Sequence, residues 1–208
     1  MKHRSLRPTQ FAILESSSTI ISTWIARVRK FLTRSAACQL ISALVLSHID
    51  YGNSLLAGLP AKSLHPLKKV QNAAARVITG ARMRDFMTPH LRDLHWLPVP
   101  YRIDFKIAVI TYRCVNGCAP SYLSNLIRLT TSVSHNGRSL RSLSSPSAPY
   151  DLVPQSARVK TYCSRAFSNY APTVWNKLPL SVRSSPTLSL LSQVPFLSRS
   201  FLNPSSPY

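Results

Sequence analysis

The sequence predicts a mainly α-helical protein: a helical bundle, then a Ser- and Pro-rich arm, then a short C-terminal helical module. Large apolar residues recur every three or four positions over several segments, which is the period of a helix rather than of a strand. Hydrophobic residues make up 45% of the 208 residues, enough to bury a real core. Between Thr130 and Lys160 the composition shifts to Ser, Pro and Arg, which predicts a linker or extended arm.

The sequence of the N-terminal part predicts two helices that follow a leader. Residues 1–19 show no sustained period, and we expect them to be disordered. From 20 to 32 the apolar residues fall on one helical face: Ile20, Ile21, Trp24, Ile25, Val28, Phe31 and Leu32. Ser35 can cap a second helix that runs to Leu56 and is apolar nearly all round, as a central core helix would be. Gly58 and Pro60 follow and end it.

A third helix is predicted from Ser63, as its N-cap, to about Thr79, with Gly80 as a C-cap. Its apolar side carries Leu64, Leu67, Val70, Ala74 and Val77. A connecting stretch follows that is punctuated by Pro89, Pro98 and Pro100 and anchored by Leu91, Leu94, Trp96 and Leu97.

The segment from Val99 to Val115 alternates partly as a strand would, but its length favours a helix, because strands rarely run to ~15 residues. Asn116 and Gly117 close this helix in the prediction. Pro120 can open another helix, to about Leu129.

These elements predict a helical domain over 20–130, an arm over 131–160 and a short module over 161–184. Within the module Pro172 is expected to kink or restart the helix around Trp175. The tail, 185–208, is Ser- and Leu-rich without a pattern and is expected to be disordered.

The charge balance points to a polyanionic partner. The chain has 26 Lys and Arg against 6 Asp and Glu, a formal net charge of +20 at pH 7. An excess of this size is typical of proteins that meet nucleic acid or an anionic membrane surface. The most apolar run, Leu40 to Leu56, is interrupted by polar residues and falls short of the ~20 apolar residues that a bilayer span needs. We therefore expect nucleic acid as the partner of the chain, and no membrane.

The four cysteines (Cys38, Cys114, Cys118 and Cys163) lack the paired spacings of a zinc site or of a secreted disulfide scaffold. We interpret them as reduced intracellular thiols and expect no metal. The nucleus or cytoplasm is the expected location. Residues 1–37, with seven basic residues and one acid, are also typical of a mitochondrial presequence, so import into mitochondria remains an alternative.

Catalytic patterns are lacking. Two-metal phosphoryl transfer needs converging carboxylates. The six acids (Glu15, Asp50, Asp85, Asp93, Asp104 and Asp151) include no two closer than eight residues in sequence. The five glycines form no phosphate-binding loop, and no nucleophile elbow is present. We predict a non-enzyme without a cofactor.

One local cluster, formed by His90, Asp93 and His95, has acid–base potential. His95 stands between Leu94 and Trp96 in an apolar turn, and we interpret it as a buried, hydrogen-bonded core histidine.

Two basic stripes are the candidate binding residues. Lys69 and Arg76 share a side of the third helix, opposite its apolar residues. Arg102, Lys106 and Arg113 fall within about 40° of one another on the next helix, at 100° per residue. Charged stripes are often only the solvated face of a helix. Here the sole acid expected nearby is Asp104, and we predict phosphate contacts for all five cations.

Four blocks carry a resemblance to a known family: LVLSHIDYGNSLLAGLP at 44–60, LKKVQNAAARVITG at 67–80, TPHLRDLHWLPVPYRIDFKIAVITYRCVNGCAPSYLSNLI at 88–127, and RSLRS at 138–142 with RAFSNYAPTVWNKLPLSVR at 165–183. In order and spacing they resemble the region that follows the catalytic palm in jockey-like and related LINE-type (non-LTR) retrotransposon reverse transcriptases. The resemblance extends from Arg27 to Leu190.

The resemblance implies a thumb-like region, since in such enzymes the catalytic aspartates lie upstream, in a palm that this chain lacks. The implied function is to grip the backbone of template and primer, RNA or DNA, without sequence specificity, beside the upstream palm. Two alternatives remain. The chain can be a stand-alone protein-interaction fragment that uses the apolar face left by the palm, or a remnant of the element with no retained activity.

Overall fold

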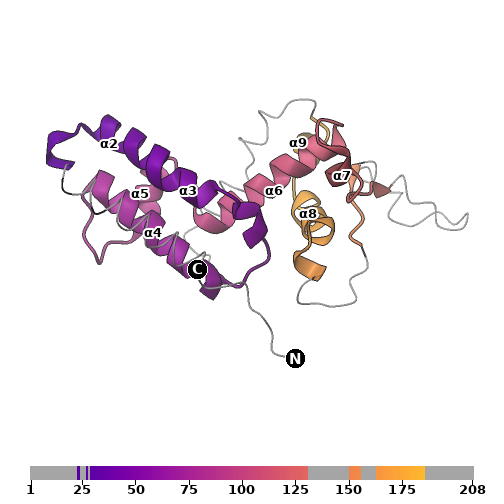
Figure 1. Cartoon of the computed structure of the whole chain (residues 1–208), viewed down its shortest axis with the longest axis horizontal. Helices are drawn as coiled ribbons and strands as arrows, with labels where there is room; N and C mark the ends of the chain where they lie inside the picture. Colours follow the sequence, from indigo (N-terminus) through magenta and orange to yellow (C-terminus); the bar gives the residue numbers. More distant parts are fainter. Residues whose placement is uncertain (1–22, 24–26, 28, 131–149, 156–162, 186–208) are drawn as a thin grey trace, which may run out of the picture. The chain divides into compact units, whose positions relative to one another are not determined.

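The computed structural model describes Thr23, Arg27 and residues 29–130, 150–155 and 163–185. This described part is mainly helical, as predicted, and contains no strand; its one β feature is an isolated antiparallel bridge between Leu129 and Leu152. The chain divides into two compact units, Met1–Arg102 and Ile103–Tyr208. The division falls inside a helix (Figure 1), whereas the sequence prediction placed a boundary near residue 131.

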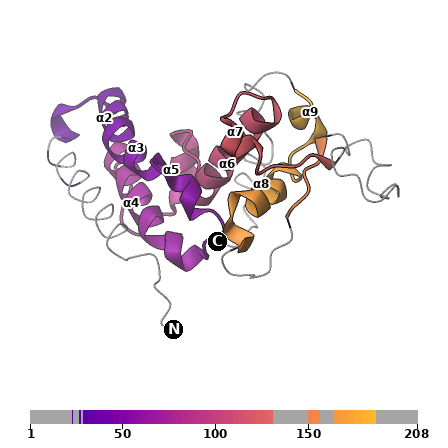
Figure 2. The same ribbon diagram turned by 45° about the vertical axis from the view of Figure 1, so that its right-hand side comes forward.

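The first unit is built around one long helix. Its elements are a 3-10 turn (Arg29–Phe31), α2 (Arg34–Ile41), a π-helical turn (Ser42–Leu46), α3 (Ser47–Asp50), a second 3-10 turn (Asn53–Leu56), α4 (Ala61–Thr79), α5 (Met87–Asp93) and the start of α6 (Val99–Val115). Figures 1 and 2 both show α2 and α5 lying beside α4. The apolar side of α4 therefore faces its neighbours, as its three-and-four periodicity requires.

A polar side chain, that of Gln71, lies in the core of this unit. Gln71 is fully buried on α4, and its Nε2 donates to the carbonyl oxygen of Leu97 at 2.7 Å. Because a buried amide without a partner is costly, this bond fixes the segment before α6 against α4.

The C-terminal end of α4 is capped from two directions. Gly80 is left-handed, with φ +73°, and its N–H donates to the carbonyl of Arg76, which confirms the predicted C-cap. The Arg29 guanidinium donates to the carbonyls of Val77 and Ile78, at 3.0 and 3.2 Å. Carbonyls that a helix end leaves unpaired thus obtain a cationic partner.

The second helix predicted from the sequence differs from the observed one. Thr33, not Ser35, provides the N-cap, since its hydroxyl accepts from the N–H of Ala36 at 3.2 Å. The helical run stops at Asp50 rather than at Leu56, because the chain turns through Gly52 at φ +65°. Of the helix predicted over 20–32, most lies outside the described residues.

The structure differs from the prediction at the start of two helices, and a proline lies at or near each start. Helix α4 begins at Ala61, two residues before the predicted cap, with Pro60 as its N-cap residue. The stretch predicted as a connection contains α5, and Pro89 is its third residue. The N–H groups of a first helical turn have no intrahelical acceptor, so a proline there sacrifices no bond.

The prediction of a buried His95 is wrong. His95 is exposed and adopts φ +54° in the left-handed position that ends α5. The next N–H, that of Trp96, donates to the carbonyl of Leu91 at 2.8 Å, and that of His95 to Arg92 at 2.9 Å, which together form a Schellman motif. The reversal brings Trp96, 6% exposed, into the core and leaves His95 in solvent.

The second unit contains the rest of α6, α7 (Ser121–Ser124), a 3-10 turn (Cys163–Arg165), α8 (Phe167–Trp175) and α9 (Leu180–Arg183). The helix predicted from Val99 to Val115 is confirmed at both ends. Gly117, at φ +69°, closes it as predicted. Figures 1 and 2 show α8 beside α6, and the rings of Tyr112 and Trp175 lie 6.5 Å apart between them.

Part of the predicted arm is packed. Leu152 is 2% exposed, its N–H donates to Oδ1 of Asn176, and Nδ2 of Asn176 donates to its carbonyl. Asp151 also binds Arg183, so the described part of 131–160 is held against the helices. Pro172 lies inside an unbroken α8 and does not restart it. The predicted leader and almost all of the predicted tail lie outside the described residues.

Candidate nucleic-acid interface

An exposed basic face runs along α4 in the first unit. Lys62, His65 and Lys69 are exposed and recur at three and four, so they share one face of the helix. No acidic residue occurs in α4. The buried residues Leu67, Gln71 and others lie on the opposite side, and the basic face is therefore open to a ligand.

Arg76 extends the same face, but two of its donors bind the protein's own backbone. Its Nε donates to the carbonyl of Arg82 at 3.2 Å and its Nη2 to that of Met83 at 3.1 Å. The side chain thus ties the connection that follows α4 to the helix itself. Arg76 was predicted as a phosphate contact; in the structure it anchors a loop.

Arg102 is also engaged within the first unit. Its Nη1 lies 2.5 Å from the carboxylate of Asp50, its Nε donates to the carbonyl of Leu97 at 3.0 Å, and its side chain is 15% exposed. The expectation that Asp104 is the only nearby acid is wrong, because Asp50, distant in sequence, pairs with Arg102. A half-buried, paired guanidinium contributes mainly to holding the fold.

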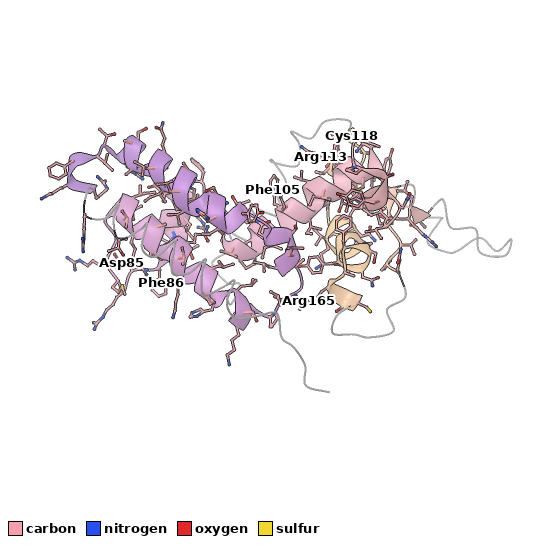
Figure 3. All side chains as sticks on the ribbon, in the orientation of Figure 1. Asp85, Phe86, Phe105, Arg113, Cys118 and Arg165 are labelled. Atoms are coloured by element: carbon pink, nitrogen blue, oxygen red, sulfur yellow. The ribbon has the colours of Figure 1, made fainter. Side chains whose placement is uncertain are left out.

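The second unit carries the remaining two predicted cations. Lys106 and Arg113 are exposed on α6, seven residues apart, which places them on one face about 10 Å apart along the axis. Figure 3 marks Arg113 near the end of that helix. Asp104 lies about 160° around the helix from Lys106. Its carboxylate does not neutralise this face.

Asp104 faces α8 instead. The Tyr170 hydroxyl donates to its Oδ1 at 2.8 Å. Burial raises the pKa of the Asp104 carboxyl above its usual value, and the Tyr170 hydrogen bond and the charge of Lys177 oppose that rise. The carboxyl is a packing group between two helices.

The five predicted cations therefore fall into two groups. Lys69, Lys106 and Arg113 offer open side chains, whereas Arg76 and Arg102 bind groups of the protein itself. Sequence reasoning missed Lys62, because it started the helix at Ser63, and it left out His65 although that residue lies within the predicted helix. The seven-residue interval from Lys62 to Lys69 was the available signal, since it repeats a helical face.

Other chemistry is sparse in the described ranges. They hold no group of three His, Cys, Asp or Glu residues placed to bind a metal ion. Cys114 is buried, and burial raises the pKa of its thiol, while Cys118 is exposed. No helix among the described residues is both long and apolar enough to cross a bilayer.

Comparisons of the chain with models of protein families, with curated proteins and with solved structures gave no match in any of the three.

Proposed function

We propose that the chain binds the phosphate backbone of nucleic acid without reading its sequence, as the non-catalytic C-terminal region of a LINE-type reverse transcriptase. The sequence blocks described above support the origin, and the basic helix faces support the binding. No residue is assigned a catalytic role.

One observation carries the proposal: the open face of α4 presents cations, and the helix has no acid to neutralise them. Three of the described acids are engaged elsewhere, since Asp50 binds Arg102, Asp93 binds Arg34 and Asp151 binds Arg183. Like charges on one surface repel, and a polyanion relieves that repulsion while releasing its condensed counterions. Such contacts position a backbone and do not discriminate bases.

The proposed contacts are Lys62, Lys69, Lys106 and Arg113, a pair in each unit. Replacing all four with Gln removes four cations and leaves the buried faces intact. Each duplex phosphate contact contributes about −0.9 to the slope of log K against log salt, so the variant should flatten that slope by about 3 to 4. Fluorescence anisotropy of a labelled duplex of about 20 base pairs, titrated at several salt concentrations, measures the slope.

The matched control replaces four exposed cations outside α4 and α6 with Gln: Arg27, Lys30, Arg128 and Lys177. This variant has the same net charge and should change the slope by less than about 1. If both variants flatten the slope equally, affinity follows total charge and no defined contact surface exists. Binding that persists at roughly 0.5 M salt contradicts backbone contacts altogether.

A protein-interaction function is the second candidate, and exposed apolar side chains favour it. Tyr51 is 84% and Leu55 79% exposed, on the turn that follows α3. Exposed apolar groups of this size suit a protein contact, such as the upstream palm that the family resemblance implies. Salt-insensitive or absent nucleic-acid binding by a folded chain selects this candidate.

A further inference from the structure

The connection between α4 and α5 exposes two large apolar side chains next to arginines. In this segment, which we name the Arg82–Phe86 loop, Met83 is 85% and Phe86 88% exposed. Figure 3 marks Asp85 and Phe86 on it. Apolar side chains so far out in solvent contribute nothing to the core of their own unit.

The Arg82–Phe86 loop is nevertheless held in one shape. The N–H of Asp85 donates to the carbonyl of Arg82 at 3.2 Å, and the N–H of Arg82 donates to Oδ2 of Asp85 at 2.6 Å. Arg76 grips the same turn from α4 through the carbonyls of Arg82 and Met83. Met87, 8% exposed, anchors the chain directly after Phe86. A ligand would meet a preformed turn and would not have to order it.

The loop is also positively charged. Arg82 and Arg84 are exposed, and the Arg76 guanidinium lies against the backbone of the turn. Asp85 is the one acid in the loop, and its Oδ2 accepts a backbone N–H. Three arginines thus lie in or against the loop that carries the exposed ring, with a single carboxylate among them.

We propose that the Arg82–Phe86 loop stacks the Phe86 ring on an unpaired base of single-stranded nucleic acid, with Arg82 and Arg84 on the flanking phosphates. This inference rests on the proposed function and adds a preference for single strands to it. Every base offers a flat face next to phosphates, and stacking on aromatic side chains tolerates any sequence. In a duplex the bases are already stacked, so the ring reaches them only at an end.

Tyr51 provides the comparison within the same unit. It is 84% exposed, close to the 88% of Phe86, but it follows Asp50, whose carboxylate is paired with Arg102, and no Arg or Lys is near it in the sequence. Exposure alone therefore does not distinguish the two rings. What distinguishes Phe86 is the flanking charge, which suits a polyanion.

The test uses the full chain with a single-stranded oligothymidine and an abasic strand of the same length, which has the same phosphates but no bases. The wild type should bind oligothymidine about tenfold more tightly than the abasic strand. Phe86→Ala should weaken oligothymidine binding about tenfold and leave abasic binding unchanged. Tyr51→Ala, the matched control, should leave both affinities as in the wild type.

A second variant gives a direct signal. Phe86→Trp keeps an aromatic ring at an exposed position, and stacking on a base should quench the added emission relative to the wild type. Oligothymidine should produce this quenching, and the abasic strand should not. Quenching by both strands alike would contradict stacking.

A blunt duplex of the same length separates this inference from the proposed function. If the duplex binds with steep salt dependence while Phe86→Ala leaves oligothymidine binding unchanged, stacking is overturned and backbone binding stands. If neither nucleic acid binds, both fall. If Phe86→Ala weakens binding to phosphatidylserine vesicles and not to oligothymidine, the loop contacts lipid and the inference is overturned.

Discussion

At the scale of single residues, Asp104 shows how position decides the role of an acid. The sequence places it on a helix with Arg102 and Lys106, and we expected it to be the acid nearest to both. In the folded unit it accepts a hydrogen bond from Tyr170 on α8 and is largely removed from water. Its raised pKa means that the charged form is disfavoured by folding.

Asp104→Asn tests this balance. Because the folded pKa lies above the unfolded one, the stability that the acid contributes is full below its unfolded pKa and is lost as pH rises through its folded pKa. Asparagine can still accept from Tyr170 and carries no charge. The melting temperature of the variant, relative to the wild type, should therefore rise between about pH 4 and pH 7. A difference that stays constant or falls over that range in thermal unfolding contradicts the assignment.

The exposure of a single residue was predictable where it depends only on the residue's position on its own helix. Exposure of Lys69, Lys106 and Arg113 followed from spacing, because the opposite faces are apolar. Arg102 could not be assigned in this way, since its partner Asp50 is 52 residues away in sequence. The Arg82–Phe86 loop was missed for a similar reason: its shape depends on Arg76, and no local periodicity marks it.

At the scale of elements, α4, α5 and α6 each end in a left-handed residue, which is a glycine in α4 and α6. Gly80 ends α4, Gly117 ends α6 and His95 ends α5. A glycine adopts this conformation without steric cost, and the two glycine caps were predictable for that reason. The left-handed His95 was not predictable, because residues other than glycine rarely adopt a positive φ.

Gly80→Ala isolates the conformational cost of such a cap. A Cβ at Gly80 would meet no atom within 4 Å, so the penalty comes from φ +73° alone. We expect the free energy of unfolding to fall by about 1 kcal/mol. Gly80→Asn should lose less, since asparagine tolerates this region better. Urea unfolding measures both, and equal losses would show that the cost is not conformational.

Element boundaries were predictable where helical period and cap agree, as for α6 from Val99 to Val115. They were not predictable at prolines. Pro89 suggested a connection and lies in the first turn of α5, and Pro172 suggested a restart and lies inside α8. Pro89 costs α5 no hydrogen bond because it lies in the first turn, and α8 tolerates Pro172 because the neighbouring Ala171, Val174 and Trp175 are buried.

At the scale of the whole molecule, the net charge of +20 opposes compactness. The described ion pairs, Arg34–Asp93, Arg102–Asp50 and Arg183–Asp151, engage three of the six acids. Most cations therefore have no acid available to them, and their mutual repulsion is a property of the chain rather than of one helix.

Salt should therefore stabilise the free protein. Raising NaCl from roughly 20 to 300 mM shortens the Debye length from about 20 to below 8 Å and screens the repulsion. A gain of about 1 kcal/mol corresponds to a rise of roughly 2–4 °C in Tm for a chain of this size. Calorimetry measures the shift. The variant with Gln at Lys62, Lys69, Lys106 and Arg113 should show a smaller rise, and a fall in wild-type Tm contradicts the argument.

The hydrogen bonds of Arg29 to the end of α4 have a consequence for the kinetics of the binding that we propose. Its guanidinium donates to the carbonyls of Leu32, Val77 and Ile78, so it has few donors left for a phosphate. Its charge is unaffected by these bonds and still adds to the positive field around the chain. Under the proposed function we therefore expect Arg29 to accelerate encounter with a polyanion without lengthening residence, whereas Lys62 and Lys69, with open ammonium groups, should act on both rates.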